Sequence, residues 1–209
     1  RLLAGSRLAE PEAEAVRAKC AAWLESRMAD KLAPLMALQA EMETPAQEDG
    51  ETAPLRGLAR GIAFRLLESF GARPRSQVAD DLRKVDQDAR KGLRRFGIRI
   101  GATSLYIPLL LKPHAVELRL MLWALWHGHD SLPALPTPGL VWIRTDPAAP
   151  REFYEIAGFR LIGNHEAVRS DMLERLADTV RPLGKNGAEF TVSPDIMGLI
   201  GCSGDSFAR

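Results

Sequence analysis

RKGLRRFGIRIGATSLYIPLLLKPHAVELRLMLWALWHG, residues 90–128, is the stretch that decides the predicted fold. It begins as the basic end of a helix and continues through residues 98–107, which alternate and are rich in β-branched side chains. Such a segment predicts a short strand or a hairpin. Pro113 and Gly128 then predict the start and the end of a helix that is apolar on nearly every side. A helix of that kind is expected to be buried.

The sequence before this stretch predicts three helices. Residues 11–42 carry an apolar stripe at three- and four-residue steps that includes Trp23, and Pro34 is expected to kink or divide this helix. Residues 54–70 form a second helix whose core face includes Leu58 and which Gly71 ends. Ser76 can cap a third helix over residues 77–96.

The third predicted helix is strongly basic on one side. The net charge is −4 for residues 1–55, +8 for residues 56–119 and −3 for residues 120–209, so the cations gather in the middle of a nearly neutral chain. An exposed helix face usually mixes signs, because opposite charges three or four residues apart attract. A face of cations is better explained by binding to a phosphate backbone, although a solvated surface remains the alternative. The candidate nucleic-acid-binding residues are Arg83, Lys84, Arg90, Lys91, Arg94, Arg95 and Arg99.

After residue 128 the elements are short. We expect a proline-rich loop with a strand at 140–143, a helix at 151–157, a strand at 159–163, a helix at 171–181 and a strand at 189–192. Ser193 and Pro194 predict a further helix. With the capped helix predicted after Ser203, it forms either a helix-turn-helix or a simple αα-corner. The fold class is therefore mainly α (α+β), with a helical region at 1–129 and a smaller α+β lobe at 130–209.

Several kinds of function are disfavoured by what the sequence lacks. There is no phosphate-binding loop of the Walker type, and the four histidines do not form a ligand cluster, so we expect no catalytic residue and no metal site in this stretch. No apolar run is long enough to span a membrane. The two distant cysteines, Cys20 and Cys202, fit a reducing cytoplasm better than a disulfide framework. We therefore expect a cytoplasmic binding region.

One stretch points to a different activity. Residues 152–163, EFYEIAGFRLIG, look like the helix-strand signature of the GNAT acetyltransferases. Those enzymes also need a glycine-rich loop at a helix start to hold the coenzyme A pyrophosphate. The region upstream is proline-rich instead. Acetyl transfer is therefore the least favoured alternative.

A family resemblance favours nucleic-acid binding. The chain resembles the C-terminal region of alphaproteobacterial relatives of the mitochondrial degradosome RNA helicase, an ATP-dependent helicase of superfamily two. The matching strings follow the family order: LRGLARGIAFR (55–65), KVDQDARKGLRRFGIRIGATSLY (84–106), IPLLLKP (107–113), LWALWHG (122–128), AGFRLIG (157–163), VRSDMLERLADTVRP (168–182) and MGLIGCSGDSF (197–207).

The resemblance implies a non-catalytic accessory region that packs on a helicase core and closes around a single strand. The residues that bind ATP and Mg²⁺ would lie upstream in the parent chain, so no cofactor is expected here. The implied partners are single-stranded RNA or DNA, the helicase core domains of the same chain and, as a further candidate, an exoribonuclease.

Two alternatives remain open from the residues themselves. The chain can instead be a docking module for a nuclease or another partner, which predicts an exposed apolar patch. Tyr106 can stack on a base or pack in the core. Trp123 and Trp126 are expected in the core.

Overall fold

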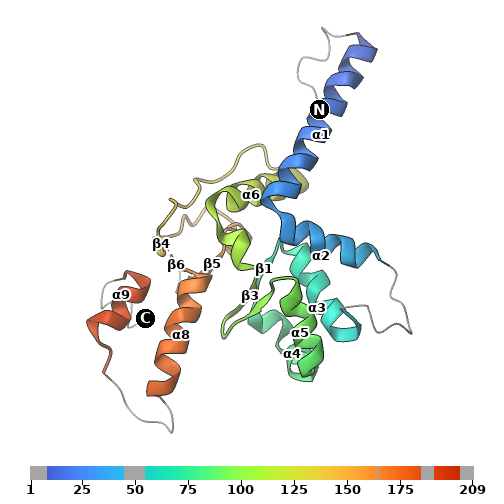
Figure 1. The fold of residues 1–209 in the computed structure, drawn as a ribbon. Coiled ribbons are helices and arrows are strands. Elements are labelled where there is room, and N and C mark those ends of the chain that lie inside the picture. Colours follow the sequence, from blue (N-terminus) through green and yellow to red (C-terminus); the bar gives the residue numbers. More distant parts are fainter. Residues whose placement is uncertain (1–8, 45–54, 164, 185–190, 203–209) are drawn as a thin grey trace.

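The helices at the start of the chain divide where the proline predicts. A computed structural model describes residues 9–44, 55–163, 165–184 and 191–202 (Figure 1). The predicted first helix is two helices, α1 (Glu10–Lys31) and α2 (Ala33–Glu43), joined at Leu32. Pro34 lies in the first turn of α2, where its missing N–H costs nothing. The helix α1 extends away from the rest of the fold, and Trp23 is 62% exposed, so its predicted apolar stripe packs only near its C-terminal end (Figure 1).

The helix α3 (Gly57–Glu68) supplies one wall of the core. Its face of Ala59, Ile62, Ala63 and Leu66 is buried, but Leu58 is 43% exposed, so its prediction as a core residue was wrong. The chain then turns through Phe70 and Gly71, which both have positive φ. A side chain on Gly71 would overlap Leu110, so the turn needs glycine for space as well as for conformation.

The predicted basic helix over residues 77–96 is not one helix. A 3₁₀ turn, η2 (Arg75–Val78), leads into α4 (Ala79–Lys84), and the chain breaks before α5 (Gln87–Arg95). The break is fixed by Asp86, whose carboxylate accepts a hydrogen bond of 2.8 Å from the N–H of Ala89 and so caps α5. The cations therefore lie on two helices and do not share one helix face.

The predicted hairpin is confirmed as β2 (Arg99–Ile100) and β3 (Ser104–Tyr106). A strand that the sequence did not predict, β1 (Ala72–Pro74), pairs with the other edge of β3, giving an antiparallel sheet in the order β1-β3-β2. Tyr106 lies in the central strand and is fully buried. It is therefore a core residue and cannot stack on a base in this structure.

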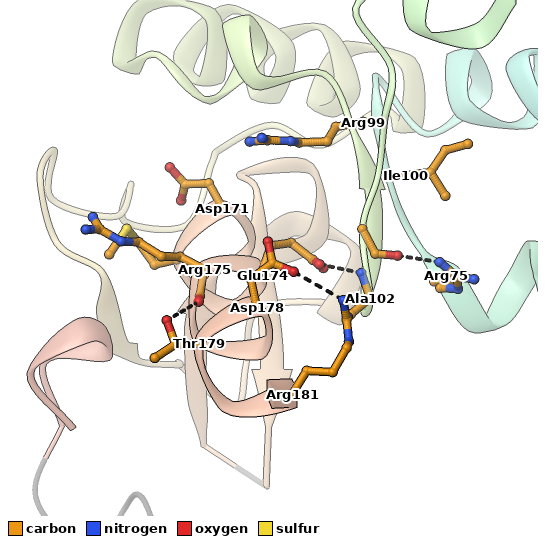
Figure 2. A pocket seen from close by; sticks show the side chains of 12 residues that line it. Arg75, Arg99, Ile100, Ala102, Asp171, Glu174, Arg175, Asp178, Thr179 and Arg181 are labelled. Carbon is orange, nitrogen blue, oxygen red and sulfur yellow. Dashed lines mark hydrogen bonds and ion pairs between the residues drawn. The ribbon is translucent and has the colours of Figure 1, made fainter. Parts of the chain in front are cut away.

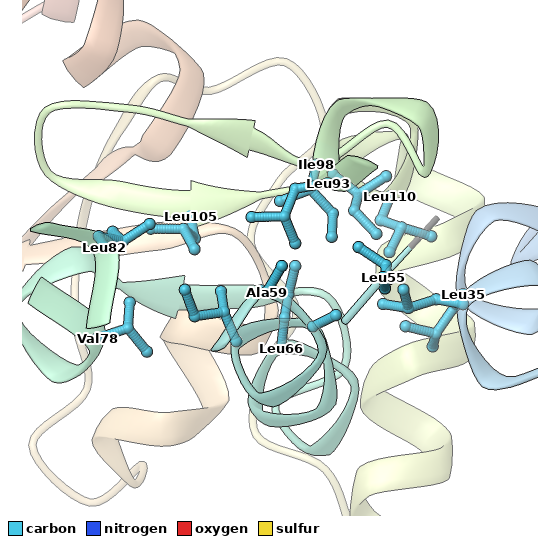
Figure 3. Packing of buried hydrophobic residues seen from close by; sticks show 14 of the residues in the cluster. Leu35, Leu55, Ala59, Leu66, Val78, Leu82, Leu93, Ile98, Leu105 and Leu110 are labelled. Atoms are coloured by element: carbon cyan, nitrogen blue, oxygen red, sulfur yellow. The ribbon is translucent and has the colours of Figure 1, made fainter. Parts of the chain in front are cut away.

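The first hydrophobic core lies beneath this sheet. Leucines and isoleucines from α2, α3, α5, the hairpin and the 3₁₀ turn η3 (Pro108–Leu111) pack together, as Figure 3 shows. Leu93 of α5 is fully buried in this cluster. The core thereby fixes the helix that carries most of the predicted binding residues.

The helix α6 (Pro113–His127) begins and ends as predicted, with Gly128 in the left-handed conformation at its C-terminus. It is not buried on all sides, however. Trp123 is 2% exposed, whereas Leu125 is 74% and Trp126 is 83% exposed, so the core prediction holds for the first tryptophan and was wrong for the second.

The rest of the described chain forms a second antiparallel sheet and its helices. The sheet has the order β4-β6-β5 and consists of β4 (Trp142–Arg144), β5 (Phe159–Ile162) and β6 (Glu166–Arg169). The helices are α7 (Arg151–Ile156), α8 (Ser170–Leu183) and α9 (Pro194–Ile200). The strand β6 was not predicted, because residues 168–171 were expected to lead into the helix at 171–181.

The predicted start of α9 is confirmed by its cap. Ser193 Oγ accepts a hydrogen bond of 3.4 Å from the N–H of Ile196. Thr191 and Val192 are not in a strand, and the remainder of the predicted strand at 189–192 lies outside the described residues. The helix predicted after Ser203 lies outside them as well.

A second hydrophobic core forms between α6, α7 and the second sheet. It contains Leu120 and Trp123 of α6 with Phe153 and Phe159, while Leu118 of the same helix belongs to the first core. The helix α6 thus joins the two cores. Among the described residues, no helix is long and apolar enough to cross a membrane. The division into regions 1–129 and 130–209 stays a prediction.

Candidate nucleic-acid interface

Four arginines line a hollow beside the first sheet. This hollow, called the arginine groove here, has a volume of about 450 Å³ and is lined by Arg75, Arg90, Arg94, Gly97, Ile98, Arg99, Ile100 and Pro108. No described residue of the lining is a carboxylate. A hollow lined by one sign of charge focuses the electrostatic potential and attracts counter-ions of the opposite sign. The arginine groove therefore suits a polyanion.

The local fold explains how the four side chains meet. Arg90 and Arg94 are four residues apart on α5 and so project from one side of it. Arg99 begins β2, directly after the Gly97 turn that ends α5. Arg75 is the first residue of η2, directly after β1, and it is brought to the hairpin because β1 pairs with β3.

Arg75 is also part of the hairpin turn. Its guanidinium Nη1 donates a hydrogen bond of 2.6 Å to the carbonyl of Gly101. Its backbone N–H donates to the carbonyl of Thr103 at 2.9 Å. The sequence did not indicate Arg75 as a site residue, because its position depends on the pairing of β1 with β3, which lie about thirty residues apart in the chain.

The structure separates the predicted binding residues into groups. Arg90, Arg94 and Arg99 line the arginine groove, while the exposed Lys84 and Arg95 lie outside it. Arg83 pairs with Asp80 at 3.0 Å, and Lys91 pairs with Asp88 at 2.8 Å. Both pairs are exposed and are therefore weak, so Arg83 and Lys91 remain able to bind phosphate.

Arg90 has a structural role in addition to its positive charge. Its guanidinium donates to the carbonyls of Leu82 at 2.7 Å and Val85 at 3.2 Å. These carbonyls lie at the C-terminal end of α4, where helical partners are missing. Arg90 therefore joins α4 to α5 across the break. In the described chain, Arg94 and Arg99 are the groove arginines whose side chains make no hydrogen bond to a main-chain carbonyl, unlike Arg75 and Arg90.

A second hollow continues from the first along the other side of the hairpin. This α8 cleft has a volume of about 700 Å³ and lies between the β2–β3 hairpin and α8 (Figure 2). It shares Arg75, Arg99 and Ile100 with the arginine groove. Its α8 side carries both signs: Arg175 and Arg181 alternate with Asp171, Glu174 and Asp178. No pattern in the sequence indicated that α8 packs against the hairpin.

Glu174 connects α8 to the hairpin turn by hydrogen bonds. Its side chain is buried, and its carboxylate accepts hydrogen bonds from the backbone N–H groups of Ala102, Thr103 and Ser104. The Thr103 hydroxyl donates a further bond at 2.6 Å. A buried charge is tolerated when hydrogen bonds replace its lost hydration, as they do here.

The described residues contain no group of three or more His, Cys, Asp or Glu side chains that could hold a metal ion. His127 and His129 stack beside Trp123, but His127 Nδ1 is already within 2.9 Å of the Trp123 carbonyl. The arginine groove can bind an anion by charge and by hydrogen bonding.

Compared with known proteins, the chain matches no described protein family, no curated protein and no solved structure.

Proposed function

We propose that this chain binds single-stranded nucleic acid, RNA or DNA, through the arginine groove. The observation that carries the proposal is the convergence of Arg75, Arg90, Arg94 and Arg99 on one hollow without a carboxylate in its described lining. Single strands without sequence preference are bound by positively charged grooves that follow the phosphate backbone. The arginines would act as counter-charges to phosphates and would not read bases.

We further propose that the chain acts as a non-catalytic accessory region of a cytoplasmic ATP-dependent helicase. The support for this step is the resemblance of the long strings between residues 55 and 207 to such helicases. In that case the helicase core of the same parent chain, with its ATP and Mg²⁺, would feed the strand into the groove, and an exoribonuclease is a candidate partner. The two free cysteines agree with a reducing compartment.

The first experiment measures the binding of a fluorescein-labelled single-stranded oligonucleotide by anisotropy at low salt. The test variant carries Arg94→Glu and Arg99→Glu. The matched control carries Arg17→Glu and Arg27→Glu, which make the same charge change on α1, the helix that extends away from the rest of the fold (Figure 1). We expect the test variant to lose about tenfold or more in affinity, and the control about twofold or less.

Equal losses of affinity in the two variants, or no binding by the unmodified chain, would contradict a groove-specific role.

The second candidate function is a protein-docking module, and a specific observation favours it. Met121, Leu125 and Trp126 expose 41%, 74% and 83% of their surfaces on the free side of α6. Exposed apolar groups gathered in this way are typical of protein interaction sites.

A further inference from the structure

The turn between β2 and β3 has the arrangement of an anion-binding site. Three successive backbone N–H groups, those of Ala102, Thr103 and Ser104, point to one carboxylate, and the Thr103 hydroxyl points to it as well. Figure 2 shows the first of these contacts, between Glu174 and Ala102. Successive N–H groups in a turn form a concave nest of partial positive charge that binds phosphates and other anions. The carboxylate of Glu174 fills this nest in the structure.

The nest does not depend on Glu174 for its shape. The turn is closed by the Gly101 N–H, which donates to the Ser104 carbonyl at 2.9 Å. From the other side Arg75 holds the carbonyls of Gly101 and Thr103 through its side chain and its backbone. The pairing of Ile100 with Leu105 fixes the strands next to the turn. The donors would therefore stay in place if Glu174 left.

Gly101 provides the space that the anion occupies. A Cβ atom at this position would overlap Cδ and both carboxylate oxygens of Glu174. Any larger residue at position 101 would thus close the nest to Glu174 and to any other anion. The requirement is one of space, because Gly101 is not among the glycines with positive φ.

Glu174 can also leave without disturbing the rest of α8. The helix keeps its packing against α9, β5 and β6, and the α8 cleft beside the nest gives the side chain room to swing out. Arg75 and Arg99 line both hollows, so a strand lying in the arginine groove passes next to the nest.

We infer that the nest of Ala102, Thr103 and Ser104 is a phosphate-binding site, and that Glu174 occupies it until a phosphate of the bound strand replaces the carboxylate. The source of that phosphate rests on the proposed function, whereas the site itself does not. Since Glu174 is tethered at the nest, its high local concentration keeps free phosphate out. A strand held by the arginines gains the same advantage of local concentration and can compete. Glu174 therefore acts as an internal competitor that weakens binding of the strand.

The test follows the backbone amide signals of residues 102–104 by NMR while inorganic phosphate is added to the full chain. Glu174→Ala should make these three signals shift at millimolar phosphate, while the unmodified chain should show no response. Asp178→Ala is the matched control, because it removes the same charge from the same helix at the same cleft without touching the turn. It should behave like the unmodified chain.

A double variant distinguishes phosphate binding in the nest from the general effect of removing one negative charge. Gly101→Ala combined with Glu174→Ala has the net charge of Glu174→Ala but a filled nest, so the phosphate response should disappear. Oligonucleotide affinity should rise roughly three- to tenfold in Glu174→Ala relative to Asp178→Ala and should fall back in the double variant. If Glu174→Ala does not fold, Glu174→Gln keeps the size of the side chain and removes its charge, and the same signs are expected.

The outcomes distinguish the two proposals. A folded Glu174 variant whose amides ignore phosphate, or an equal response in Asp178→Ala, would overturn the nest even if oligonucleotides bind the arginine groove. A phosphate response confined to residues 102–104 without oligonucleotide binding by any variant would support the nest and contradict the proposed function.

Discussion

At the scale of single residues, the fold depends on arginines that bind main-chain carbonyls. Arg119 of α6 is fully buried, and its guanidinium donates to the carbonyls of Phe70 at 2.8 Å and Leu110 at 2.5 Å. No carboxylate pairs with it in the described chain, and burial lowers its pKa to about 9. The group is still protonated at neutral pH. Because its pKa is below the ordinary value, the buried charge opposes folding at neutral pH, and this opposition weakens only as the pH rises through about 9.

The geometry of Arg119 can be tested with a change that keeps the charge. Arg119→Lys should lower the free energy of unfolding by about 1–3 kcal/mol, because one ammonium group cannot replace a planar fork that reaches two carbonyls. Urea unfolding measures this, with the exposed Arg17→Lys as the control, for which about 0.5 kcal/mol or less is expected. Equal stabilities of the two variants would mean that the two carbonyl contacts contribute nothing specific.

At the scale of elements, the sequence predicted those ends that a single residue determines. Gly128 ends α6, Pro34 begins a new helix, and Ser193 caps α9, each through a local conformational or capping effect. The break between α4 and α5 was missed, because the apolar positions of residues 78–96 keep a helical period across it. Asp86 was the residue that could have indicated the start of a new helix, because aspartate is a preferred N-cap residue. The strands β1 and β6 were missed because short strands depend on partners distant in the chain.

The role of Asp86 gives a prediction for the basic segment. Asp86→Ala should lower the free energy of unfolding by about 1 kcal/mol through loss of the α5 cap. Asp88→Ala is the control, because it leaves the cap in place. It removes an exposed pair with Lys91, for which about 0.2–0.5 kcal/mol is expected, together with an acidic side chain from the first turn of α5. Chemical denaturation of both variants compares the two values. A larger loss for Asp88→Ala would mean that the helix break is fixed by something other than this cap.

At the scale of the whole molecule, the sequence predicted a basic middle region but not its shape. The charge balance located the cations, and three of the seven predicted residues, Arg90, Arg94 and Arg99, line the arginine groove. The remaining features need tertiary contacts between distant segments. Arg75 lies at the arginine groove because β1 pairs with β3, and Glu174 lies at the hairpin turn because α8 packs against the hairpin. Neither follows from local periodicity.

The salt dependence of oligonucleotide binding tests the central claim most directly. If the four groove arginines neutralise phosphates, a plot of log affinity against log salt should have a slope of about −3, since each neutralised phosphate of a single strand contributes about −0.7. Replacing Arg94 and Arg99 with glutamine should reduce the magnitude of the slope by about 1.4 on the same basis. A slope near zero, or one that these two replacements leave unchanged, would contradict the account.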